Sequence, residues 1–142
     1  MGVRCFLIEP VFSGARFVGA DPWDDRIIKG WIRKDTGEER RHNHEFGPGA
    51  MWYATWYRRN MEWANEQSPH LIVRCPTDHD WDIDSRASNC TLPEDRLHRC
   101  WVRHGEPPDI TVDKQGLTCS AGAGSIALPN WHGFLRNGEL VS

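Results

Sequence analysis

The sequence of 142 residues predicts a β-rich α+β fold with short antiparallel strands and hairpins and one amphipathic helix around residues 50–67. Two observations carry this prediction. Short apolar runs recur between clusters of Gly, Pro, Asn and Asp, a pattern typical of strands joined by turns. One longer stretch instead places tryptophans at a helical spacing. No repeat or linker interrupts the chain, so we expect a single domain over residues 1–142.

The N-terminal part predicts three strands. Residues 5–11 and 27–33 are apolar and β-prone, and each run is bounded by turn-forming residues. Asp35-Thr-Gly37 signals a turn, after which residues 38–44 are expected to return as a polar edge strand.

The helix is predicted over residues 50–67. Trp52, Trp56 and Trp63 stand at positions i, i+4 and i+11, which fall within a narrow arc of one helical face. The competing interpretation is a strand through residues 51–57. In either case we expect most of the eight tryptophans to pack in the core.

The remaining strands follow from short apolar runs. Residues 70–75 are a clear strand, and residues 81–84 complete a hairpin with it. Strands are also expected over residues 99–103, 110–112 and 117–119. Asn137-Gly138 separates two apolar pairs at 134–135 and 140–141, and Asn-Gly is a strong two-residue hairpin signal.

Charge and hydropathy exclude several classes of protein. The formal net charge of −3 argues against a general nucleic-acid binder, which usually carries a basic domain. No apolar run approaches the about 18 residues of a membrane span, and residues 1–9 lack the apolar length of a signal peptide. We therefore expect no membrane association and reduced cysteines. The sequence leaves homo-oligomerisation open.

Cysteine and histidine crowd into the C-terminal half, where they predict a zinc site. His98 and Cys100 are two residues apart, so on a strand both side chains would point to the same face. Cys90 and Cys119 would complete a tetrahedral set of nitrogen and sulfur donors. The chain holds no Cys-x-x-Cys pair, so a disulfide and ordinary packed thiols remain alternatives.

The same region permits a thiol enzyme. Cys90 lies in a polar stretch as a candidate nucleophile, His132 is a candidate base, and Asp84 or Asp82 could orient it. The small residues 121–125 could offer backbone N–H groups to an oxyanion. The alternating acids from Asp78 to Asp84 could instead bind a hard cation, although an exposed strand edge explains them as well.

Several short motifs together resemble a group of small uncharacterised proteins of phages and prophages. In chain order the motifs are Gly-Ala-Met-Trp-Tyr (49–53), Asp-Trp-x-Ile-Asp (80–84), Ala-Ser-Asn-Cys-Thr (87–91), His-x-Cys-Trp-Val-Arg-His-Gly (98–105), Thr-Val-Asp-Lys (111–114) and His-Gly-Phe-Leu (132–135). The resemblance covers roughly residues 49–142 and carries no function with it.

The resemblance implies a phage-encoded accessory protein that acts in the host cytoplasm or in the virion. Without a complete catalytic motif, we expect a structural or protein-binding module rather than an enzyme. Its partner would be a phage structural protein or a host protein that it inhibits. The alternative is a thiol-dependent hydrolase or transferase with Cys90 as nucleophile and His132 as base.

Overall fold

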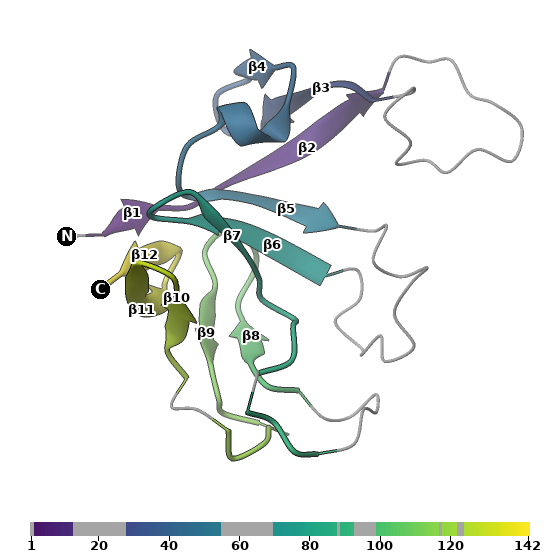
Figure 1. Cartoon of the computed structure of the whole chain (residues 1–142). Coiled ribbons are helices and arrows are strands. Elements are labelled where there is room, and N and C mark those ends of the chain that lie inside the picture. Colours follow the sequence, from purple (N-terminus) through teal and green to yellow (C-terminus); the bar gives the residue numbers. More distant parts are fainter. Residues whose placement is uncertain are drawn as a thin grey trace, which may run out of the picture.

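The computed structural model describes residues 2–12, 28–54, 70–87, 89–92, 99–116, 118–121 and 124–142. Within these ranges the strands form three sheets (Figure 1). The six-stranded sheet has the order β4 (Glu39–Arg40), β3 (Ile28–Arg33), β2 (Phe6–Phe12), β5 (Ala50–Ala54), β6 (His70–Cys75) and β7 (His79–Asp82). The four-stranded sheet has the order β1 (Val3–Arg4), β12 (Glu139–Val141), β11 (Trp131–Arg136) and β10 (Ile126–Leu128). β8 (Val102–His104) and β9 (Thr111–Asp113) make a separate pair.

The expected β-rich architecture with antiparallel hairpins is confirmed. Among the described strands, every pair is antiparallel except β2 with β5. The Asn-Gly hairpin joins β11 to β12, and its two turn residues have φ angles of 49° at Asn137 and 75° at Gly138. Positive φ at both positions is what a type I′ turn requires, so the sequence signal and the backbone agree here.

The prediction of a helix around residues 50–67 is wrong at its start. Residues 50–54 form β5, which pairs with β2 on one side and β6 on the other, and residues 55–67 lie outside the described part of the chain. Ala50, Met51 and Trp52 are all buried because both faces of β5 are covered. A strand buried on both faces loses the alternation that would distinguish it from a helix. The only helical turn described is a short 3-10 helix, η1 (Asn43–Glu45).

Three predicted strands differ from the observed ones in length or in pairing partner. The polar edge strand predicted over residues 38–44 shortens to β4 and is followed by η1. The strand predicted over residues 99–103 begins only at Val102, and β9 pairs with it rather than with residues 117–119. Within the latter stretch, Thr118 instead forms an isolated parallel bridge with Arg99.

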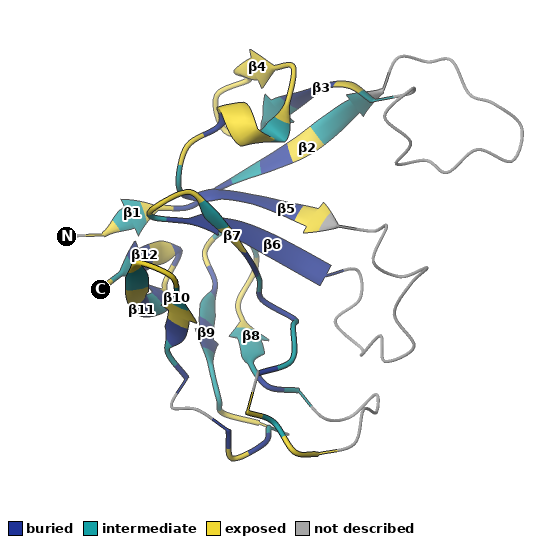
Figure 2. Ribbon diagram, viewed as in Figure 1, coloured by how far each residue is buried: buried dark blue, intermediate teal, exposed yellow. Residues whose placement is uncertain are grey.

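Two packed cores lie on opposite faces of the six-stranded sheet. Successive residues of β5 and β6 point to opposite faces, so Met51, Leu71 and Val73 enter one core while Trp52 and Ile72 enter the other. The first core also contains the buried residues of β9 to β12, whereas the second is closed by Trp31 and Phe46. β6 is buried along its whole length, as Figure 2 shows. Its two faces therefore contribute to both cores, although it lies only one strand from the edge of its sheet.

No helix in the described ranges has both the length and the apolar character needed to cross a lipid bilayer.

Candidate metal centre

Three loops bring Cys90, Cys100 and Cys119 together. Cys90 ends a turn in which its backbone N–H donates to the Ala87 carbonyl at 3.0 Å. Cys100 lies two residues before β8, and Cys119 follows β9 after a short loop. The parallel bridge between Arg99 and Thr118 aligns the residues immediately before Cys100 and Cys119. The β8–β9 pairing and this bridge bring Cys100 and Cys119 together although they are 19 residues apart in sequence.

The sulfur spacing matches what a metal ion requires. The three Sγ atoms lie within 4.8 Å of one another, and those of Cys100 and Cys119 are 3.7 Å apart. Two sulfurs bound to one tetrahedral zinc at about 2.3 Å each are separated by about 3.8 Å. A disulfide would need about 2.05 Å. The five cysteines are all thiols here. The three thiols are therefore close enough to bind one metal ion, and their spacing is not that of a disulfide.

Burial controls the protonation of Cys100. Burial, together with the neighbouring Cys119 and Cys90, raises the pKa of the Cys100 thiol to about 12. A hydrogen bond from the Ala87 backbone acts in the opposite direction and favours the thiolate. Metal ligation deprotonates a coordinating thiol, because the charge of the ion replaces that of the proton. Without a metal, Cys100 is therefore a neutral thiol at pH 7.

Lys114 supplies a positive charge beside the cluster. Its Nζ lies 3.5 Å from the Cys119 sulfur and also donates to the Ala121 carbonyl. The same Nζ lies 5.7 Å from the centroid of the Trp101 ring. Groups that hydrogen-bond to the ligands orient them and offset the negative charge of several thiolates. Lys114 and the Ala87 N–H are the functional groups that sequence reasoning missed, because neither residue type signals a metal site by itself.

His98, the fourth ligand predicted from the sequence, lies outside the described residues. Three of the four predicted ligands are thus brought together, and the fourth stays a prediction. The buried thiols Cys5 and Cys75 belong to the main core and are separate from the cluster.

The residues of the thiol-enzyme alternative each have other partners. His132 Nε2 lies 2.8 Å from Ser125 Oγ. Asp84 accepts the Leu71 backbone N–H at 2.9 Å, and its other oxygen lies 3.2 Å from Arg103 Nε. Cys90 belongs to the thiol cluster. The catalytic set of Cys90, His132 and Asp84 therefore stays a prediction that these contacts do not favour.

The alternating acids are also engaged separately. Asp80 pairs with Arg74 at 2.9 Å, and Asp82 Oδ2 lies 2.7 Å from the buried His70 Nδ1. Asp82 Oδ1 accepts the Asp84 backbone N–H at 2.9 Å. These carboxylates hold β6 and β7 together, so the structural interpretation explains them better than a hard-cation site.

No family model, no curated protein and no solved structure matches this chain. The function must therefore be inferred from the residues and their geometry.

Proposed function

We propose that this protein is a structural or protein-binding module whose C-terminal loops are held together by one zinc ion. Cys90, Cys100 and Cys119 would be ligands, with His98 as the fourth. The observation that carries the proposal is the 3.7 Å spacing of two buried sulfurs with a third nearby. Three sulfurs and one imidazole form a common structural zinc set.

The position of the cluster supports a structural role rather than a catalytic one. Cys100 and Cys119 are buried, and they pack with Ala87 and Ala121 in a small core of their own. A catalytic zinc keeps one coordination position open to water, whereas a structural zinc is enclosed by four protein ligands. The ion would join three loops whose own apolar contacts are few, which is where a metal adds most to stability.

The biological setting that we propose is a phage-encoded accessory protein. The sequence resemblance to phage proteins and the lack of a complete catalytic motif support this. Such a protein would act in the host cytoplasm or in the virion, through contacts with a phage structural protein or a host protein. Its negative formal charge supports a protein partner over nucleic acid.

Zinc content of matched cysteine variants tests the metal site. The wild type, purified without chelator, is expected to hold about one zinc per chain, and Cys100→Ala to lose it. Cys5→Ala is the control, because Cys5 is an equally buried thiol outside the cluster. His98→Ala is expected to bind zinc with at least about tenfold lower affinity.

Two results would overturn this proposal. Equal zinc content in wild type and Cys100→Ala would place the metal elsewhere. A metal-free protein in which Cys90 alone reacts rapidly with iodoacetamide at mildly acidic pH would favour the thiol-enzyme alternative.

A further inference from the structure

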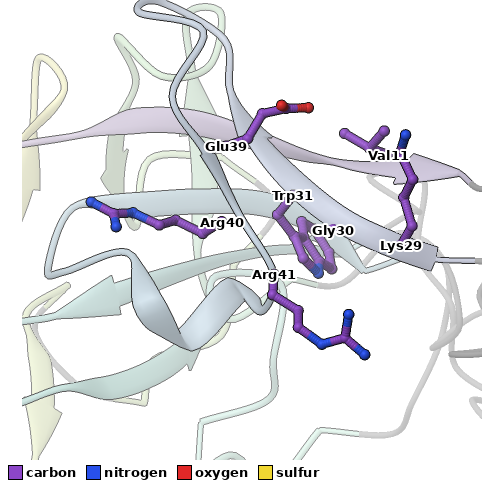
Figure 3. A pocket seen from close by; sticks show the side chains of 7 residues that line it. All are labelled: Val11, Lys29, Gly30, Trp31, Glu39, Arg40 and Arg41. Carbon is purple, nitrogen blue, oxygen red and sulfur yellow. The ribbon is translucent and has the colours of Figure 1, made fainter.

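A groove with a positive rim lies at the far edge of the six-stranded sheet. It follows the junction of β3 and β4 and has a volume of about 300 Å³. Figure 3 shows the residues that line it: Val11, Lys29, Gly30, Trp31, Glu39, Arg40 and Arg41. Trp31 is largely buried and belongs to the second core, so it gives the groove a rigid apolar wall.

The charge of the groove is opposite to that of the chain. Three cations and one carboxylate, that of Glu39, line it, whereas the whole protein has a formal charge of −3. Arg40 pairs with Glu38 at 2.9 Å. Among the described residues, Lys29 and Arg41 have no carboxylate within ion-pair distance, whereas Arg33, Lys34 and Arg74 each have one. Two exposed cations are thus available to a partner.

The backbone beside the groove suits an extended ligand. β4 is the edge of the sheet and pairs with β3 through only Trp31–Arg40 and Ile32–Glu39. Gly30 allows this close pairing, because a Cβ there would lie 3.0 Å from the Arg40 carbonyl oxygen. The outer side of an edge strand presents backbone donors and acceptors to which an incoming strand can bind.

We propose that this groove binds an extended acidic segment of a partner protein. Carboxylates of the segment would contact Lys29 and Arg41, whose charged ends lie above and below the Trp31 ring in Figure 3. An apolar side chain of the segment would contact Trp31, which lines the groove. A peptide is favoured over a nucleic acid because the groove lies beside an edge strand, whose backbone groups can pair with an extended chain.

This inference rests on the proposed role as a protein-binding module, but it does not require the zinc site. The probe is a fluorescein-labelled peptide of alternating glutamate and valine, compared with the same peptide carrying lysine and with a thymidine oligonucleotide. Binding to the full chain is followed by fluorescence anisotropy at low and high salt. We expect the glutamate peptide to bind more tightly than both other probes, and more weakly at high salt.

Charge-reversal variants locate the binding surface. Lys29→Glu and Arg41→Glu should each weaken binding of the glutamate peptide at least about tenfold at low salt. Arg136→Glu is the matched control, because Arg136 is an exposed arginine of β11 that stacks on Phe134. It should change binding less than about twofold. Circular dichroism checks that each charge-reversal variant is folded. If one is not, Lys29→Gln or Arg41→Gln replaces it in the binding assay.

Three outcomes would overturn the groove assignment: no peptide binding, equal loss in the Arg136 control, or tighter binding of the oligonucleotide through Lys29 and Arg41. Chelation separates this inference from the zinc proposal. Peptide binding by a chain that holds no zinc would support the groove alone. If Cys100→Ala loses zinc but the wild type binds no peptide, the result would support the metal centre alone.

Discussion

At the scale of single residues, burial determines the protonation state and reactivity of three of the cysteines. It raises the pKa of Cys5, Cys75 and Cys100 to about 12 each, so these thiols are neutral and poorly nucleophilic at pH 7. Of the three, only Cys100 has two further sulfurs beside it. The same burial that suppresses nucleophilic chemistry is compatible with the metal ligation that we propose for this thiol.

Zinc binding should release protons, because the buried thiols start out protonated and must ligate as thiolates. The apparent zinc affinity should therefore fall by at least about tenfold when the pH is lowered from about 7 to about 6. Competition with a chromogenic chelator at both pH values measures this. Calorimetry in two buffers of different ionisation enthalpy counts the protons. A zinc affinity that does not change with pH would mean that the thiols are not the ligands.

Asp84 should make stability depend on pH. Burial raises the pKa of this carboxyl to about 6 from its ordinary 3.8, although Arg103 and the Leu71 N–H oppose the change. Between these two values the folded state binds the proton more readily than the unfolded chain. The free energy of unfolding should therefore decrease as the pH rises from about 4 to about 6, by at most about 3 kcal/mol from this group.

Urea denaturation of wild type and Asp84→Asn across this pH range tests the contribution of Asp84. Asparagine cannot titrate, so the variant should show a flatter pH dependence. Asp80→Asn is the control, because Asp80 is half exposed in its pair with Arg74. An unchanged slope in Asp84→Asn would show that other groups cause the pH dependence.

At the scale of elements, local signals predicted the hairpins well and the central sheet less well. Asn137-Gly138 specifies its turn by backbone conformation alone, and residues 70–75 are too apolar and too short to be anything but a buried strand. Residues 50–54 were misassigned because their tryptophan spacing fits a helix, whereas pairing with β2 and β6 determines the strand. A single sequence does not show these long-range pairings.

The candidate site was predictable to a similar degree. Residue type and spacing identified Cys90, Cys100 and Cys119 as possible ligands, and the structure brings them together. The contribution of Lys114 was not predictable, because it depends on the loop after β9 folding back on Cys119. Asp84 and His132 were plausible as one catalytic set because the spacing of residues in a sequence does not show where each one lies in the fold.

The turn before β5 gives a test of local packing. Gly49 has a φ angle of 99°, and a Cβ there would overlap the Arg4 carbonyl oxygen. Gly37 has a φ angle of 80° but open space around it. Gly37→Ala should thus cost about 1 kcal/mol from backbone strain alone, and Gly49→Ala at least about 2 kcal/mol more. Urea denaturation measures both, and equal losses would contradict the overlap at Gly49.

At the scale of the whole molecule, the thiol cluster is a satellite of the main core. Trp101 packs against both, and its ring meets that of Trp81 edge-on at a centroid distance of 5.4 Å. The two cores of the six-stranded sheet include none of the three clustered cysteines. Removal of zinc should therefore loosen the loops without unfolding the sheet.

Hydrogen exchange with and without chelator tests this separation. Chelation should speed amide exchange at residues 99–104 and 118–121 by at least about tenfold, because few apolar contacts hold these segments. Exchange in β6 should change little. Equal acceleration in both regions would mean that the metal supports the entire fold, in which case the zinc is required for folding.

The short segment at the start of the chain belongs to both large sheets. β1 pairs with β12, the Cys5 N–H donates to Gly138, and the next residue, Phe6, donates to Gly49 and continues into β2. A protein prepared without residues 2–12 would thus leave β12 unpaired in one sheet and open a gap between β3 and β5 in the other. A synthetic peptide of that segment, added in trans, could bind at both positions and restore the fold. Such complementation would turn assembly of the molecule into a bimolecular reaction that can be followed by titration.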